Sequence, residues 1–167
     1  MKKSSKVKQH DISDCGAACI ASVSSHYGLH YPIARIRQYA YTDKQGTNIL
    51  GLVEAAEKLN FAAKGVKATK EALIENMIPL PAIAHVYIED KKWYHYVVIY
   101  KANNKKVTYM DPAYGEFVTC TLDEFEAIWT GKLVILEPKP QFQGGNQDQS
   151  LFKKFITLLK PHRSVLI

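Results

Sequence analysis

The hydrophobic pattern divides the chain into a helical first half and a strand-rich second half. Residues 15–27 contain no proline and no Lys, Arg, Asp or Glu, and most positions are small or apolar. Such a segment is typical of a helix that is buried on nearly all sides. Apolar positions at helical spacing predict two more helices, at 32–41 and at 47–60, the second with Thr47 as its N-cap.

After Pro79 and Pro81 the pattern changes to that of strands. Thr121 and Glu124 form the sequence signature of a capping box for one further helix, at 122–129, which Gly131 is expected to end. Another short helix, capped by Thr69, is expected at 69–76. Strands are predicted at 61–68, 82–89, 93–101, 106–111, 116–121 and 132–138. Helices followed by an antiparallel sheet predict an α+β fold class.

Composition places the chain among soluble globular proteins. Of its 167 residues, 47% are hydrophobic and 23% are charged, which excludes a disordered chain. The net charge of +6 suggests an acidic peptide, an anionic membrane surface or nucleic acid as partner, although a solvated surface with spare lysines explains it equally well. Three cysteines argue against a disulfide framework. Neither a secretory signal nor a stretch long enough to be a transmembrane helix is found in the sequence.

Cys15 is the best candidate for a reactive group. It stands where a polar loop turns into the buried helix, and the positive end of a helix dipole favours a thiolate. Cys19, one turn deeper, and Cys120, in a strand, are better explained as small buried hydrophobic residues. Cys15 is therefore the candidate nucleophile.

A cysteine nucleophile needs a base, and the base needs a group that orients it. Of the six histidines, His95 has a partner that the predicted hairpin supplies. If the turn is centred on Asn103, His95 faces Asp111 to within about one position, close enough for the carboxylate to hold the imidazole through its Nδ1 hydrogen. Gln9 lies six residues before Cys15, and its side-chain amide could join the Cys15 backbone N–H as a second donor to an oxyanion.

Three stretches then carry a resemblance to a known family. The segments "QHDISDCGAACIASVSSHYG", "HYVVIY" and "MDPAYG" resemble the bacteriocin-processing peptidase domain of peptidase-containing ABC transporters. The resemblance extends from Gln9 to about Pro138. It implies a papain-like cysteine peptidase that removes leader peptides after a double glycine. It also implies Cys15 as nucleophile, His95 as base, Asp111 as its orienting group and Gln9 as oxyanion-hole donor.

The resemblance also implies an organisation and a setting. Residues 1–138 would be the peptidase domain, 139–150 a linker, and 151–167 the start of the entry helix to a transmembrane domain. The domain would lie on the cytoplasmic side of the bacterial cell membrane. Its expected partners are a precursor peptide with an amphipathic leader ending in Gly-Gly and the transmembrane and ATP-binding domains of the transporter, with no nucleic acid. No cofactor is expected in this fragment, because the phosphate-binding motif G-x-x-x-x-G-K-[ST] is absent from the sequence and ATP would bind elsewhere.

Three other functions remain to be compared with this one. A non-catalytic leader-binding domain of the same fold would lack the thiol or the base. A structural zinc module could use Cys15, Cys19 and His26, which share a helix face, and a nucleic-acid binder could use the basic excess. Within the peptidase hypothesis, Trp93 and Tyr96 are expected to wall a slot that admits only glycine. The apolar stripe of 47–60 would either receive the leader or belong to the core.

Overall fold

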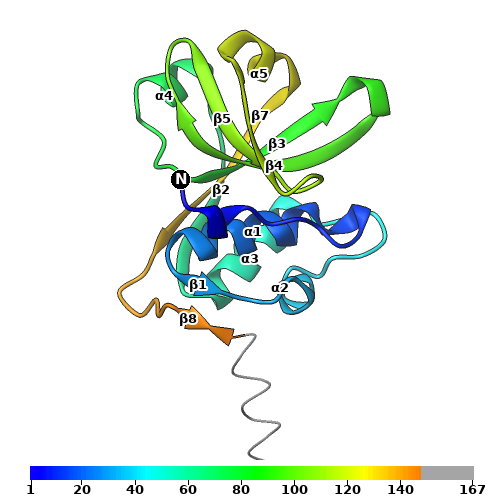
Figure 1. The fold of residues 1–167 in the computed structure, drawn as a ribbon, viewed down its shortest axis with the longest axis vertical. Helices are drawn as coiled ribbons and strands as arrows, with labels where there is room; N and C mark the ends of the chain where they lie inside the picture. Colours follow the sequence, from blue (N-terminus) through cyan, green and yellow to red (C-terminus); the bar gives the residue numbers. More distant parts are fainter. Residues whose placement is uncertain (148–167) are drawn as a thin grey trace, which may run out of the picture.

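The computed structural model describes residues 1–147, in which a group of helices packs on a curved antiparallel sheet (Figure 1). The helices are α1 (Cys15–His26), α2 (Ile33–Tyr39), α3 (Ile49–Lys58), α4 (Lys70–Ile74) and α5 (Leu122–Ile128). The sheet contains, in spatial order, β2 (Phe61–Lys67), β7 (Trp129–Pro138), β3 (Ala82–Ile88), β4 (Trp93–Ala102), β5 (Lys106–Asp111) and β6 (Glu116–Thr121). The predicted α+β class is confirmed.

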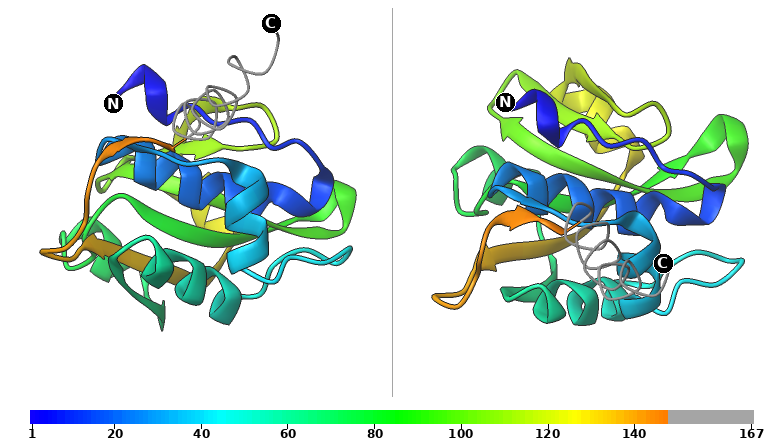
Figure 2. Two further views of the ribbon diagram at one scale, coloured as in Figure 1. Left: turned by 90° about the horizontal axis from the view of Figure 1, so that it is seen from below. Right: turned by 60° about the horizontal axis from the view of Figure 1, so that its bottom comes forward.

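Helix α1 is the centre of the molecule. Every residue from Cys15 to Ser25 is buried, as the absence of charge in this segment predicted. Its small side chains let it lie between the sheet and helices α2 and α3. Among its buried serines, Ser22 has two polar partners: its hydroxyl lies 2.8 Å from the Tyr100 hydroxyl of β4 and donates to the Ser5 carbonyl at 2.6 Å. Figure 2 shows the N-terminal segment that carries Ser5 running alongside α1.

Two hydrophobic clusters hold the layers together. The larger one joins α1, α2 and α3 to the sheet and includes Ile20, Leu52, Phe61 and Val98. The second lies on the other side of the sheet, where Phe125 of α5 packs with residues of β3, β4, β5 and β7. Most of the apolar stripe of α3 belongs to the first cluster, because Leu52, Ala56 and Leu59 are buried. That stripe is therefore largely core.

Two predicted boundaries are wrong by a few residues. The N-cap of α3 is Asn48, whose side chain accepts a hydrogen bond from the Gly51 N–H, while the hydroxyl of Thr47 is engaged by Thr42 at 2.5 Å. Helix α5 ends at Ile128, and Gly131 lies inside β7 with a φ of +77°, which glycine tolerates without strain. The prediction made the strand at 132–138 the closing strand of the sheet. In the structure this strand, β7, lies inside the sheet, between β2 and β3.

The register of the β4–β5 hairpin also differs from the prediction. The structure pairs Val98 with Met110, whereas a turn centred on Asn103 would have paired Val98 with Thr108. The main cause is the turn, which lies further along the chain than expected, so that Ala102 pairs with Val107. A bulge between Ile99 and Lys101 then changes the register by one position. The recorded pairing stops at Val98 and Met110, so His95 and Asp111 meet beyond its end rather than as directly opposed residues.

Residues 139–146, which were predicted as the first part of a linker, run back along the helical layer. The ring of Phe142 packs on Phe61 with centroids 4.7 Å apart, and the Gly145 N–H donates to the Gly28 carbonyl at 2.9 Å. β8 (Gly145–Asn146) pairs in parallel with β1 (Leu29–His30). The predicted domain boundaries stay predictions, and the predicted entry helix at 151–167 lies outside the described residues. In the part of the chain that the structure describes, no helix is both long and apolar enough to cross a membrane.

The contact between α2 and α3 generates a stability prediction at Gly51. A Cβ atom there would lie 2.3 Å from the Ala40 carbonyl oxygen, a contact with backbone that cannot rotate away. Gly-to-Ala in a helix interior ordinarily stabilises by about 1 kcal/mol, but here we expect Gly51→Ala to destabilise by about 1–3 kcal/mol. Urea unfolding measures the difference, with the exposed Leu50→Ala as a control within about 0.5 kcal/mol of the original. A more stable Gly51→Ala variant would contradict the packing described.

Candidate active site

Cys15 is the first residue of α1 and follows a single 3-10 turn, Ile12–Asp14. The turn is fixed by a capping box: the Asp11 side chain accepts from the Ile12 N–H at 2.6 Å, and the Asp14 side chain accepts from the Asp11 N–H at 3.0 Å. This geometry places the thiol at the positive end of the helix dipole, where a thiolate is stabilised. The side chain is only 7% exposed, but it lines an open cleft.

An ion pair beside the nucleophile was not predicted from the sequence. Asp14 is buried, and its Oδ1 lies 2.8 Å from Nη1 of Arg37 in α2, a close ion pair without the alignment of a hydrogen bond. A buried carboxylate next to Cys15 would oppose a thiolate, and the guanidinium neutralises this charge. Only the fold brings residues so far apart in sequence together, so no local signal could have found the pair.

His95 and Asp111 are in contact, as predicted. His95 Nε2 donates to Asp111 Oδ1 at 2.8 Å, and the same oxygen accepts from the Ala113 N–H at 2.9 Å in the turn after β5. The predicted nitrogen was wrong: the bond uses Nε2, at the tip of the ring, because Asp111 is reached beyond the end of the strand pairing. The nitrogen left for Cys15 is therefore Nδ1.

The surroundings of His95 favour its protonated form. Burial alone lowers the pKa of the imidazole, but hydrogen bonds to Asp111 and Cys15, together with the charges of both groups, raise it to about 9. At neutral pH the ring is therefore the positively charged imidazolium, which is the form that pairs with a thiolate at Cys15.

Trp93 has a position that the sequence did not predict. It was expected to wall a substrate slot, but it does not line the cleft at Cys15. Its ring instead stacks on the imidazole of His95, with centroids 6.0 Å apart and planes inclined by 10°. The two residues are two positions apart in β4, so their side chains leave the strand on the same side.

Gln9 lies beside the turn that carries Asp111. Its backbone N–H donates to the Pro112 carbonyl at 2.8 Å, and a Cβ at Gly115 would lie 2.9 Å from the Cβ of Lys8, so the two segments touch. The side-chain Oε1 of Gln9 is buried and has no hydrogen-bond partner among residues 1–147. The structure thus brings Gln9 to the Asp111 turn, while its role as an oxyanion donor stays a prediction.

The other two cysteines lie in surroundings that keep them protonated. Burial, together with the charges of Cys15 and Asp111, raises the pKa of Cys19 well above its usual value. Burial and Glu124 raise the pKa of Cys120. Among the described residues, no group of three or more Cys, His, Asp or Glu side chains is arranged to hold a metal ion.

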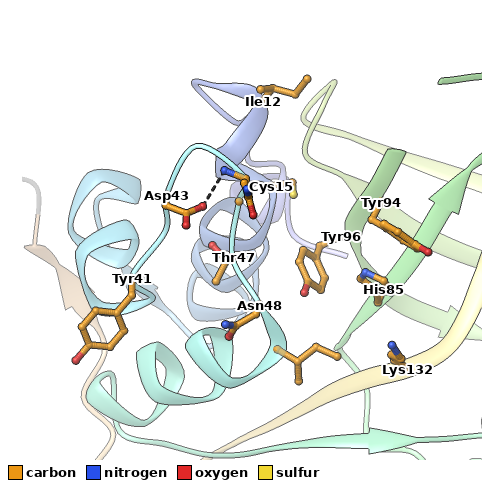
Figure 3. Close-up of a pocket in the computed structure, with 13 residues that line it drawn as sticks. Ile12, Cys15, Tyr41, Asp43, Thr47, Asn48, His85, Tyr94, Tyr96 and Lys132 are labelled. Atoms are coloured by element: carbon orange, nitrogen blue, oxygen red, sulfur yellow. Dashed lines mark hydrogen bonds between the residues drawn. The ribbon is translucent and has the colours of Figure 1, made fainter. Parts of the chain in front are cut away.

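A cleft of about 500 Å³ opens at Cys15 between the helical layer and the sheet (Figure 3). Its helical wall comes from the loop before α3, and its sheet wall comes from β3, β4 and β7. Three of its residues are large, apolar and mostly exposed: Ile12, Tyr41 and Tyr94. The other lining residues are Asp43, Gln45, Gly46, Thr47, Asn48, Ile49, His85, Tyr96 and Lys132. Tyr96 thus lines the cleft as expected, and Tyr94 and His85 are additions that the sequence alone did not reveal.

The site generates a prediction about thiol reactivity. Because Cys15 meets the imidazolium at a helix N-terminus and Cys19 is held as a buried thiol, iodoacetamide should label Cys15 first at pH 7. Mass spectrometry of the intact chain and of its tryptic peptides measures the order of labelling. In the matched variant His95→Ala, labelling of Cys15 should slow at least tenfold. Equal labelling of Cys15 in both proteins would contradict the pairing of these two residues.

Comparison with known proteins identifies the family of the chain. The family model of the Peptidase C39 family matches residues 3–141. The lactococcin-G-processing and transport ATP-binding protein LagD of Lactococcus lactis subsp. lactis is 38% identical over 161 residues, which are 96% of this chain and 23% of that protein. The pediocin PA-1 transport/processing ATP-binding protein PedD of Pediococcus acidilactici is 33% identical over 152 residues, which are 90% of this chain and 21% of that protein. The chain therefore spans less than a quarter of the length of these relatives.

Two solved structures have the same fold. The peptidase domain of Streptococcus ComA, described as a bi-functional ABC transporter involved in a quorum sensing pathway, matches with a TM-score of 0.73 and 40% identity, over 80% of this chain and 97% of that one. A double glycine motif protease from an AMS/PCAT transporter, solved with its leader peptide, matches with a TM-score of 0.71 and 28% identity, over 80% and 90% of the two chains. Taken together with the family match over residues 3–141, these likenesses show that the chain belongs to the Peptidase C39 family of cysteine peptidases and has their papain-like fold.

Proposed function

We propose that this chain removes the leader of a precursor peptide by cutting after a Gly-Gly pair. The observation that carries the proposal is the meeting of three groups: Cys15 at the start of α1, His95 near the start of β4, and Asp111 at the end of β5. A leader-binding domain without activity would have no need of this arrangement, so the geometry favours a peptidase over that alternative. The likeness to a double glycine motif protease supports the choice of substrate.

The three groups support a two-step reaction. The Cys15 thiolate attacks the carbonyl carbon of the second glycine, and the oxyanion that forms accepts hydrogen bonds from the Cys15 backbone N–H and the Gln9 side-chain amide. The His95 imidazolium then gives its proton to the departing amine, which leaves a thioester. In the second step neutral His95 takes a proton from water, the hydroxide attacks the thioester, and the thiolate is released. Asp111 holds the imidazole in place throughout and stabilises its charge.

The cleft supports selection for glycine at the cut. Its sheet wall carries the rings of Tyr96, Tyr94 and His85 near Cys15, so a chain without side chains fits closest to these rings. Further from the cut, the exposed side chains of Ile12, Tyr41 and Tyr94 offer apolar contacts to one face of an amphipathic leader. The leader would then supply affinity, while the Gly-Gly pair would allow the near-attack geometry.

We further propose that the domain works as part of a peptide-exporting ABC transporter on the cytoplasmic side of the bacterial membrane. The names of the relatives, which combine processing, transport and ATP binding, support this setting. ATP would then act at a nucleotide-binding domain outside this chain, and the described part would work without a cofactor.

A matched pair of peptides tests the proposed specificity. Two synthetic precursor peptides are identical except that the leader ends in Gly-Gly in one and in Gly-Ala in the other, before the bond to be cut. They should bind with similar affinity, because the rest of the leader makes the contacts. Turnover of the Gly-Ala peptide should fall at least a hundredfold, since one added methyl group would meet the rings of the sheet wall and block the attack geometry. Cys15→Ala should bind both peptides and cut neither. Comparable cleavage of the two peptides by the unaltered protein would remove the double-glycine proposal.

The role of Gln9 has its own test. Gln9→Ala should lower kcat on the order of a hundredfold by removing one oxyanion donor, with little change in KM. Gln9→Glu is the matched control, because it keeps the size of the side chain but removes the donor, and it should be equally slow. A raised KM with normal kcat in Gln9→Ala would instead assign Gln9 to substrate binding.

A further inference from the structure

His85 stands on the sheet wall of the Cys15 cleft and takes no part in the chemistry described above. It comes from β3 and lies between Tyr94, Tyr96 and Lys132 (Figure 3). The ring is held on both sides: it stacks on Tyr94 with planes inclined by 17° and centroids 5.0 Å apart, and it contacts Tyr96 at 5.2 Å. A side chain fixed in this way is able to recognise a ligand without first losing conformational freedom.

The hydrogen bonds of Thr130 determine which nitrogen of His85 carries the proton. The Thr130 hydroxyl donates its single hydrogen to the His85 carbonyl at 3.0 Å. The same oxygen lies 2.8 Å from His85 Nδ1, so there it acts as the acceptor. The proton of the neutral ring is therefore on Nδ1, and Nε2 carries a lone pair.

The charges around His85 favour this neutral form. Burial and the Lys132 ammonium lower the pKa of the ring below its ordinary value. The other titratable side chains of the cleft are Asp43 and Tyr41 on the opposite wall, Cys15 at its end, and the phenols of Tyr94 and Tyr96 beside the ring. At neutral pH the cleft thus offers a hydrogen-bond acceptor at His85 and not a second cation. Within residues 1–147, Nε2 has no partner, and the residue is only half-buried.

We propose that His85 Nε2 accepts a hydrogen bond from the backbone N–H of one of the two leader glycines and is a specificity-determining residue of the cleft. The proposal rests on the proposed function and adds the group that recognises its substrate. A glycine pair has no side chains to grip, so its peptide N–H and C=O groups are the polar features that the enzyme can read. An acceptor on a wall of flat rings suits a backbone that lies against that wall.

The test replaces single backbone N–H groups of the substrate. Three synthetic peptides share one leader: the parent Gly-Gly peptide, and two versions in which the N–H of one glycine or the other is replaced by an ester oxygen. The value of kcat/KM is measured at pH 7.5 for the 167-residue chain and for His85→Phe, which keeps an aromatic ring but has no acceptor. Thermal unfolding and alkylation of Cys15 check that the variant is folded.

A hydrogen bond of this kind contributes about a threefold to tenfold factor in kcat/KM, mostly through KM. With the unaltered chain, kcat/KM for one of the two esters should therefore be lower than for the parent peptide by this factor. With His85→Phe, kcat/KM for that ester and for the parent peptide should be equal. Thr130→Val, which leaves the ring in place but removes the partner of Nδ1, should reduce the effect of the same ester. If both esters lower kcat/KM by the same factor in all three proteins, His85 does not bind a glycine N–H. If the unaltered chain does not cut the parent peptide, the proposed function itself is wrong.

Discussion

The bond between His95 and Asp111 joins the start of β4 to the end of β5, and the rest of the site is built around it. Asp111 is fixed in its turn by the Ala113 N–H, so the carboxylate presents a fixed oxygen to the imidazole. The backbone of Gln9 is tied to the same turn through Pro112. One short loop therefore sets the positions of the base, its orienting group and the candidate oxyanion donor.

The nucleophile reaches this loop because α1 is made of small, uncharged residues. A helix that is buried on all sides can lie close to the sheet, and its first residue then meets His95 near the start of β4. The imidazole is nearly enclosed between the thiol and a carboxylate, where an unpaired charge would be costly. Because its pKa is raised in the folded chain, the ion pair contributes stability that is full below pH 6.5 and is lost as the pH rises through about 9.

The sequence predicted the elements well because they rest on local signals. The charge-free run of α1, the capping box at Thr121 and the strand periods around residue 95 all depend on neighbours in sequence. The contact between His95 and Asp111 was also predicted, but the turn is not centred on Asn103, and a bulge at Ile99–Lys101 changes the register once more. The bond to Asp111 consequently uses Nε2 of the imidazole instead of Nδ1. Bulges have no reliable local signature, so this detail required the structure.

Other features were out of reach because they join segments distant in sequence. Arg37 meets Asp14 only after α2 packs on α1, and the cleft forms only when the loop before α3 comes opposite β3 and β7. The stacking of Trp93 on His95, away from the cleft lining, was missed for the same reason: the period of a strand tells which residues share a face, but not what lies against that face. His85 in β3 had no motif to mark it.

The central claim is that Cys15 and His95 form one charge-paired unit, and an NMR titration of the histidines tests it most directly. In the unaltered chain the His95 imidazole should titrate near pH 9. In Cys15→Ala the contribution of the sulfur is removed, and the pKa of His95 should fall while Asp111 stays in place. The pKa of His26, which burial and Lys2 lower without any contribution from Cys15, should be the same in both proteins. A pKa of His95 that is unchanged by Cys15→Ala would contradict the account.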